Sequence, residues 1–210
     1  LLKVLNHEIK FRAPELFIKP QEKSWVDVFL AELGITNNDL VVGIIPGGGA
    51  SWGENNFLKH WPLENYAGIA NRMAGEFGAK IIIFADDAER ELASILIKEM
   101  KTPAVNLAGR TNLRQLMALI HRCRLVILND GGPLHMAVSQ GVKTVSVFGP
   151  VDPHVYGPYP KTAGHIVITA SVPCRPCYRH FRYQRCGHRR CIGDIPAEAV
   201  YAAAARLLRK

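Results

Sequence analysis

Short apolar runs alternate along this chain with stretches of helical periodicity. Runs of this length are typical of buried parallel strands; they span residues 40–45, 79–84, 105–107, 125–128, 143–148 and 165–169. Apolar positions three and four apart, with cap residues, prolines and glycine stops, predict helices between them, at residues 25–33, 62–77, 112–121, 133–140 and 196–208. Ser24 and Thr111 are the expected caps of the first and third of these helices. The alternation predicts an α/β fold with a Rossmann-like, doubly wound parallel sheet.

Turn-forming and acidic residues follow several of the predicted strands. Glycines begin at Gly47 after the first strand, acidic residues follow the second, and Asp130 follows the strand at 125–128. Parallel strands end at a common edge, and open α/β sheets bind their ligands there. We therefore expect these turns to share one ligand-binding edge.

The stretch from Asn129 to Ala137 is the leading candidate for an anion site. Gly131 and Gly132 make a tight turn, and Pro133 suits the first turn of a helix because it has no N–H group to leave unpaired. The free N–H groups and the positive dipole end of that helix attract anions, and His135 lies in its first turn. The alternative is an ordinary strand-to-helix turn.

The run Gly47-Gly48-Gly49 is a second candidate loop, since glycines let the backbone approach a phosphate. It matches neither a Walker A loop nor a GxGxxG motif, and a flexible surface loop is the alternative. Lys59 precedes a helix N-terminus, where a cation is unfavourable, so we expect it to face a bound anion. Asp86 and Asp87 suit the start of a helix, but Asp87 could also accept ribose hydroxyls.

Composition and charge suit one domain with an anionic partner. The chain has 210 residues, 48% of them hydrophobic, and a net charge of +8. Basic residues crowd into one stretch, which indicates a phosphorylated substrate, nucleic acid or an acidic lipid surface; they are Arg175, Arg179, His180, Arg182, Arg185, His188, Arg189 and Arg190. We find neither a run of about 18 apolar residues nor a signal peptide. The chain opens without Met, as a fragment lacking an N-terminal part would.

Four cysteines cluster within the same basic stretch. Cys174, Cys177, Cys186 and Cys191 have the spacing Cys-x2-Cys-x8-Cys-x4-Cys, which suits a tetrahedral zinc site without matching a standard ribbon. Free thiols, disulfides or a redox pair are the alternatives, and neighbouring arginines are expected to lower the thiol pKa values. A rival hypothesis is a four-cysteine zinc module that binds nucleic acid with Tyr178, Phe181 and Tyr183. The fifth cysteine, Cys123, is expected in the core.

Several motifs together resemble one enzyme family. They occur in the family's order over residues 41–205, and they are Pro46-Gly47-Gly48, Lys59-His60-Trp61-Pro62, Leu107-Ala108-Gly109-Arg110-Thr111, Asn129-Asp130-Gly131-Gly132-Pro133-Leu134-His135 and Val147-Phe148-Gly149-Pro150-Val151-Asp152-Pro153. The chain thus resembles the C-terminal domain of the ADP-heptose:lipopolysaccharide heptosyltransferases, glycosyltransferases of GT-B architecture. Two departures are a longer segment between Gly47 and Lys59, and Gly131 in place of a frequent Thr or Ser.

The resemblance implies a division of the chain and roles for its residues. Residues 1–40 would form an interdomain linker or extension, and residues 41–210 a donor-binding domain with a cysteine-rich insert at 173–191. Lys59 would neutralise the donor pyrophosphate and Asp87 would hold the ribose. The remaining donor-binding positions would be Gly47, Gly48, Asp130, Gly131, Gly132 and His135, with Asp130 ordering the turn.

The resemblance also implies the reaction, an inverting transfer of heptose from ADP-heptose to a lipopolysaccharide core. Lys59 and fixed N–H groups would stabilise the charge on the leaving ADP, so no metal would be needed for transfer. The catalytic base would be an Asp of an N-terminal acceptor domain, so no catalytic residue is assigned here, and we expect these residues to bind ADP without turnover. The location would be cytoplasmic, at the inner membrane face, with no nucleic acid partner. A UDP-sugar transferase or epimerase is the alternative enzyme.

Overall fold

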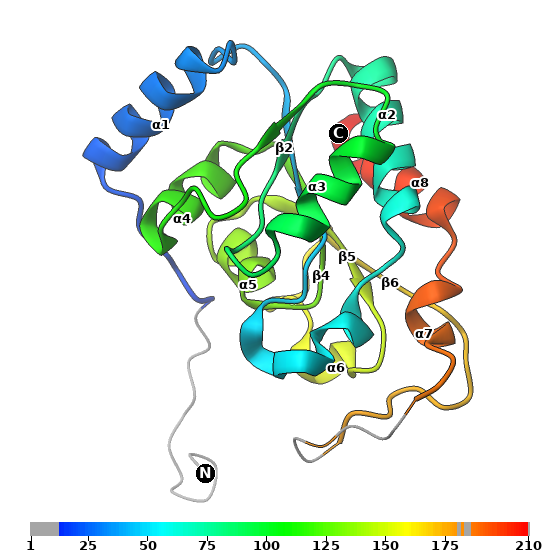
Figure 1. Cartoon of the computed structure of the whole chain (residues 1–210). Coiled ribbons are helices and arrows are strands. Elements are labelled where there is room, and N and C mark those ends of the chain that lie inside the picture. The colour runs from blue at the N-terminus through cyan, green and yellow to red at the C-terminus, as the bar shows by residue number, and fades with distance from the viewer. Residues whose placement is uncertain (1–12, 180–181, 183–185, 210) are drawn as a thin grey trace, which may run out of the picture.

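The fold is a single six-stranded parallel sheet with helices on both faces (Figure 1). The computed structural model describes residues 13–179, 182 and 186–209. The strand order is β3-β2-β1-β4-β5-β6, which is the Rossmann order and confirms the predicted fold class. The strands are β1 (Val41–Ile45), β2 (Lys80–Ile83), β3 (Ala104–Asn106), β4 (Leu125–Asn129), β5 (Lys143–Phe148) and β6 (His165–Thr169).

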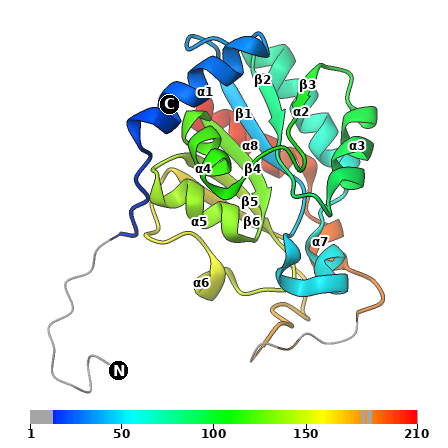
Figure 2. The ribbon, with the colours of Figure 1, turned by 60° about the vertical axis from the view of Figure 1, so that its left-hand side comes forward.

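Two hydrophobic clusters cover the two faces of the sheet, because successive strand residues point to opposite faces. Val42 and Ile44 of β1 belong to one cluster, whereas Val41 and Ile45 belong to the other. The first face is covered by α2 (Leu63–Phe77), α3 (Arg90–Glu99) and α8 (Ala197–Arg209). The second is covered by α1 (Pro20–Glu32), α4 (Leu113–Arg122) and α5 (Gly132–Ser139) (Figure 2). The sheet is therefore doubly wound.

The first helix starts earlier than predicted. It begins at Pro20 because proline suits the first helical turn and because the Glu22 carboxylate accepts the backbone N–H of Lys19 at 2.8 Å. Ser24 lies inside the helix and donates to the Pro20 carbonyl, so its prediction as a cap was wrong. Val26 and Leu30 bury this helix against the domain core.

The cap of α4 is one residue later than predicted. The Asn112 side chain accepts the backbone N–H of Gln115 at 2.9 Å, and the Gln115 side chain accepts that of Asn112. Thr111 is therefore not the cap. This reciprocal pair satisfies two N–H groups that the first helical turn would otherwise leave unpaired.

Three short elements lie outside the predicted pattern. They are η1 (Ala50–Lys59), a 3-10 segment kinked at Gly53, α6 (Pro153–Tyr156) and α7 (Arg190–Gly193). The glycine run precedes the first of these, and Gly47 and Gly48 are buried, so the run is not the flexible surface loop that was its alternative interpretation. Within the described residues, no helix has the length and apolarity that a membrane crossing requires.

Candidate functional site

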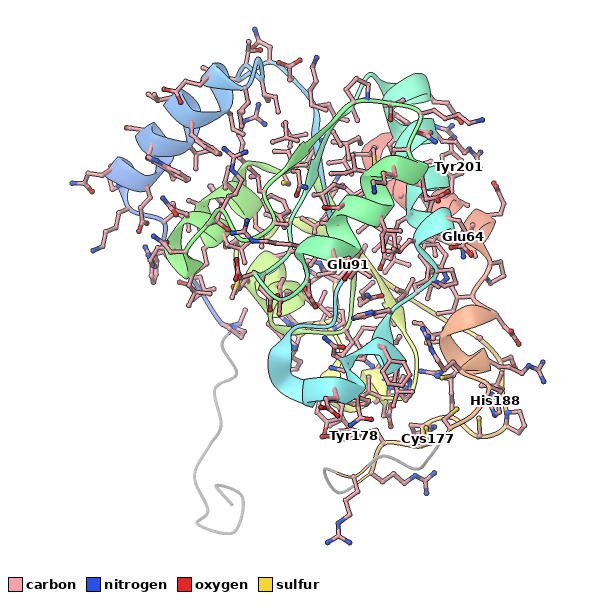
Figure 3. The ribbon with its side chains drawn as sticks, in the orientation of Figure 1. Glu64, Glu91, Cys177, Tyr178, His188 and Tyr201 are labelled. Atoms are coloured by element: carbon pink, nitrogen blue, oxygen red, sulfur yellow. The ribbon has the colours of Figure 1, made fainter. Side chains whose placement is uncertain are left out.

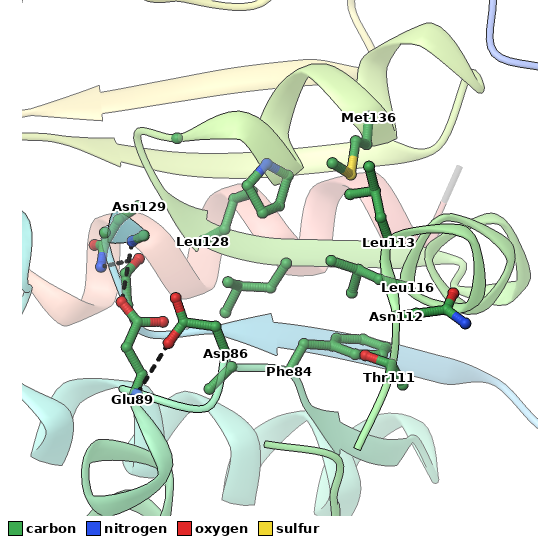
Figure 4. Close-up of a pocket in the computed structure, with 17 residues that line it drawn as sticks. Phe84, Asp86, Glu89, Thr111, Asn112, Leu113, Leu116, Leu128, Asn129 and Met136 are labelled. Atoms are coloured by element: carbon green, nitrogen blue, oxygen red, sulfur yellow. Dashed lines mark hydrogen bonds between the residues drawn. The ribbon is translucent and has the colours of Figure 1, made fainter. Parts of the chain in front are cut away.

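A cavity of about 320 Å³ opens at the carboxyl edge of the sheet (Figure 4). It lies beside the ends of β1, β2 and β4 and the N-terminal ends of α4 and α5. Its walls are mainly apolar, formed by Ile45, Phe84, Leu113, Leu116, Leu128, Pro133 and Met136. A slot of this kind suits a flat, largely apolar group such as a nucleobase.

Both predicted glycine turns border this cavity. Gly47, Gly48 and Gly131 line it. The Asn129 amide holds the first turn by donating to the carbonyls of Pro46 and Gly47, and its oxygen accepts the Tyr66 hydroxyl at 2.8 Å. The sequence analysis gave Asn129 no role of its own, although it is the first residue of the central motif.

The carboxylates that line the cavity are Asp86 and Glu89, rather than Asp87. Glu89 is only 6% exposed and accepts the backbone N–H of Gly49 at 3.0 Å. Burial raises the pKa of this carboxyl, and its backbone hydrogen bonds only partly offset the effect. A Cβ on Gly47 would lie 2.1 Å from a Glu89 oxygen, so a side chain at this position would displace the Glu89 carboxylate.

The predicted ribose residue, Asp87, lies outside the cavity lining. Its side chain is 81% exposed and forms an ion pair with Arg90 at 2.5 Å. The chain turns between residues 86 and 89, where the Asp86 carboxylate accepts the Glu89 N–H at 3.0 Å. This turn, which has no periodic signal, decides which acidic side chain faces the cavity.

Lys59 and Asp130 form a buried ion pair next to the Gly131 turn. Their charged atoms are 2.9 Å apart, and the residues are 5% and 6% exposed. The Lys59 ammonium also lies 4.6 Å from the centre of the Trp52 ring. The cation expected to face an anion is thus already held by a carboxylate at the same edge. Neither residue lines the cavity.

The two other candidates at the start of α5 are exposed. Gly132 and His135 lie on the surface of the first turn and do not line the cavity. The turn itself is closed by Leu134, whose N–H donates to the Gly131 carbonyl at 3.1 Å. The structure therefore gathers the glycine turns, Asp130 and Lys59 at one edge, with His135 at the rim.

The cysteine-rich segment is fixed to the loop after β5. Arg175 donates to the carbonyls of Gly149 and Val151 at 2.6 and 3.1 Å. The N–H groups of Cys177 and Tyr178 both donate to the Pro150 carbonyl. Figure 3 places Cys177 and Tyr178 below η1, at the carboxyl edge of the sheet. The segment therefore forms one side of the candidate site.

The thiols of this segment are free and close enough to influence one another. Burial and, to a smaller extent, the other three thiols together raise the pKa of Cys191 to about 11. The pKa of Cys177 is raised by the same causes. Arg175 lowers both pKa values, as predicted for the neighbouring arginines, but burial and the other thiols outweigh it, so the net shift is upward. Among the described residues, no group of three or more His, Cys, Asp or Glu side chains has metal-binding geometry.

Part of the basic stretch serves the fold itself. In addition to Arg175, two other arginines make structural contacts. Arg189 donates to the His60 carbonyl at 2.7 Å, and Arg190 forms an ion pair with Asp194 at 2.8 Å. His180, Phe181, Tyr183 and Arg185, which the sequence analysis named, lie outside the described residues. Fewer cations are thus left for a partner than the sequence suggested.

Known proteins resemble this chain over most of its length. The model of glycosyltransferase family 9 (heptosyltransferase) matches residues 13–185. Lipooligosaccharide heptosyltransferase 2 of Campylobacter jejuni is 30% identical over 185 residues, which are 86% of this chain and 55% of that protein. This chain therefore spans about half the length of the curated relatives it matches.

Two solved structures share the fold. A family 9 glycosyl transferase from Veillonella parvula aligns with a TM-score of 0.77 at 28% identity, over 95% of this chain and 55% of that one. The ADP-heptose lps heptosyltransferase II of E. coli aligns with a TM-score of 0.76 at 23% identity, over 98% of this chain and 56% of that one.

Proposed function

Because this chain belongs to glycosyltransferase family 9, the heptosyltransferase family, we propose that it is the donor-binding half of a GT-B heptosyltransferase. The donor would be ADP-heptose and the acceptor a lipopolysaccharide core. One observation carries this proposal, namely an apolar cavity at the carboxyl edge of the sheet, between two glycine turns and beside a buried lysine. Nucleotides bind at this edge in doubly wound folds.

The cavity offers a place for each part of the nucleotide. The adenine ring would pack between apolar walls that include Phe84 and Leu116. The carboxylates of Asp86 and Glu89 would accept hydrogen bonds from the ribose hydroxyls, which replaces Asp87 in that role. The phosphates would lie at the Gly131 turn, near Lys59, where N–H groups and a positive dipole end favour an anion.

The same groups would assist the chemical step. When the bond between sugar and phosphate breaks, negative charge grows on the leaving ADP. The Lys59 ammonium and the fixed backbone N–H groups would stabilise that charge without having to reorganise. Asp130 would hold Lys59 in position, since it pairs with the ammonium at 2.9 Å. The acceptor and the catalytic base would come from a facing domain, with inversion at the sugar carbon.

Calorimetric titration of the 210-residue chain with ADP and UDP tests the nucleotide assignment. We expect ADP to bind about tenfold more tightly, a difference of about 1.4 kcal/mol. Leu113→Asp, in the cavity wall, should weaken ADP binding. Val28→Asp is the matched control, because Val28 is equally exposed at 61% but lies on α1, outside the cavity.

Other results would favour the alternatives. Equal or tighter binding of UDP would indicate a UDP-sugar enzyme. Salt-dependent binding of an oligonucleotide, without ADP binding, would favour the nucleic acid module.

We also propose that the cysteine segment holds a structural zinc ion. The donor types suit the ion, because four sulfur ligands favour tetrahedral Zn²⁺ and the thiols of Cys177 and Cys191 are influenced by those of Cys174 and Cys186. The four thiols would have to draw closer together to bind one ion, since the described residues hold no group with metal-binding geometry. Zinc would fix the segment and would take no part in transfer. For the whole protein, we propose a cytoplasmic location at the inner membrane face, where a lipid-anchored acceptor would be met.

A further inference from the structure

Three aromatic side chains gather at the carboxyl edge, outside the cavity. We call Trp52, Tyr156 and Tyr178 the aromatic shelf. The ring centres of Trp52 and Tyr178 are 4.6 Å apart, and those of Tyr156 and Tyr178 are 5.9 Å apart. They come from η1, α6 and the cysteine-rich segment, and all three are only partly buried. Three separate segments thus contribute one ring each to a single surface.

The aromatic shelf borders the buried ion pair. Trp52 lies against the Lys59 ammonium. Burial raises the pKa of Tyr178, and the proximity of Tyr156 and Asp130 raises it further, which places the Tyr178 hydroxyl near both groups. Tyr178 is held there by its N–H bond to Pro150, beside the anchor that Arg175 provides. The ring is therefore part of the site and is fixed to the β5 loop.

The order of these features along the sheet edge matches the order of parts in a nucleotide sugar. The cavity lies at the ends of β2, β1 and β4, and the ion pair involves Asp130, directly after β4. Two members of the aromatic shelf lie near the end of β5. Tyr156 ends α6, the element that follows β5, and the Tyr178 N–H donates to the Pro150 carbonyl just after β5. With the base in the cavity and the phosphates at the ion pair, the sugar would fall on the β5 side.

We propose that the aromatic shelf binds the sugar ring of the donor. A pyranose presents C–H groups on its faces and hydroxyls at its edge, and an aromatic face carries the negative quadrupole that attracts such C–H groups. The hydroxyls of Tyr156 and Tyr178 can donate to and accept from the sugar edge. This inference rests on the proposed function, since it takes the nucleotide position from it.

The test compares a nucleotide with and without its sugar. ADP and ADP-heptose are titrated calorimetrically into the 210-residue chain and into Tyr178→Ala. We expect the variant to bind ADP-heptose about five- to tenfold more weakly and ADP as the wild type does, which also verifies its folding. Tyr178→Phe, which keeps the ring, should retain most of the affinity. Phe17→Ala, an exposed aromatic on the α1 side, should change neither affinity.

Each other outcome has a definite meaning. If Tyr178→Ala weakens ADP and ADP-heptose equally, the ring supports the nucleotide and the sugar assignment is wrong. If it weakens neither, the aromatic shelf does not bind the donor, while the proposed function stands because ADP binds. If the wild type binds neither ligand, the proposed function fails and this inference fails with it.

Discussion

At the scale of single residues, His60 should make the fold sensitive to acid. Its Nε2 atom is buried without a hydrogen-bond partner, and burial, aided by the charge of Arg189, lowers its pKa to about 4. In the unfolded chain, the His60 imidazole takes up a proton near pH 6.5, whereas in the folded chain it does so only near pH 4. The free energy of unfolding therefore decreases as the pH falls from 6.5 toward 4. The loss attributable to His60 is at most about 3 kcal/mol.

Urea unfolding of the wild type and of His60→Gln at pH 7, 5.5 and 4.5 measures this loss. We expect a flatter pH profile for the variant, with some acid sensitivity left because burial also lowers the pKa of His121 and His165. His135→Gln is the control, since His135 is exposed. Parallel profiles for wild type and His60→Gln would contradict the argument.

Site residues that belong to a recognisable motif were predictable from the sequence. Site residues that depend on a tertiary contact were not. Gly47 and Gly131 stand in recognisable turns, and both line the cavity. The pair of Lys59 with Asp130 joins positions that are distant in sequence, so no local pattern indicates it. Glu89 was overlooked because acidic residues at a helix start are explained equally well by the helix dipole.

At the scale of elements, the zinc proposal predicts that the cysteine-rich segment binds a metal ion. Purified protein is expected to contain about one zinc per chain, with the four clustered thiols protected from a thiol reagent until a chelator is added. Cys174→Ser should lose the metal. Cys123→Ala should keep it, because Cys123 is buried in the core. Protein without bound metal and with four reactive thiols would refute the zinc proposal.

Elements with a strong hydrophobic period were predictable from the sequence. The boundaries of β5 and β6 agree with the apolar runs, and α2 follows its amphipathic pattern to the stop at Gly78. In contrast, η1 and α6 are held by local hydrogen bonds, such as that of the Asp152 carboxylate with the His154 N–H at 2.8 Å. Bonds of this kind leave no periodic trace in a sequence.

At the scale of the whole molecule, the alternation of strands and helices together with the right-handed crossover rule predicts a doubly wound parallel sheet. It does not determine the strand order, because other doubly wound orders obey the same rule. The ligand edge follows in turn, because parallel strands end together. The position of the cysteine-rich segment beside the site could not be predicted from the sequence. It depends on the hydrogen bonds that Arg175 donates to the carbonyls of Gly149 and Val151, which follow β5.

The whole-molecule prediction is that the 210-residue chain binds donor but transfers no heptose. The carboxylates at the cavity and the Gly131 turn are already engaged: Asp130 pairs with Lys59, and Glu89 and Asp86 accept the backbone N–H groups of Gly49 and Glu89. Lys59 and the backbone N–H groups would stabilise the leaving ADP, but none of these carboxylates is free to activate an acceptor hydroxyl. Incubation with ADP-heptose and a lipopolysaccharide core acceptor should give no heptosylated product by mass spectrometry, although calorimetry detects donor binding. Heptosylated product from this chain alone would place the base among these residues and overturn the division of the site between two domains.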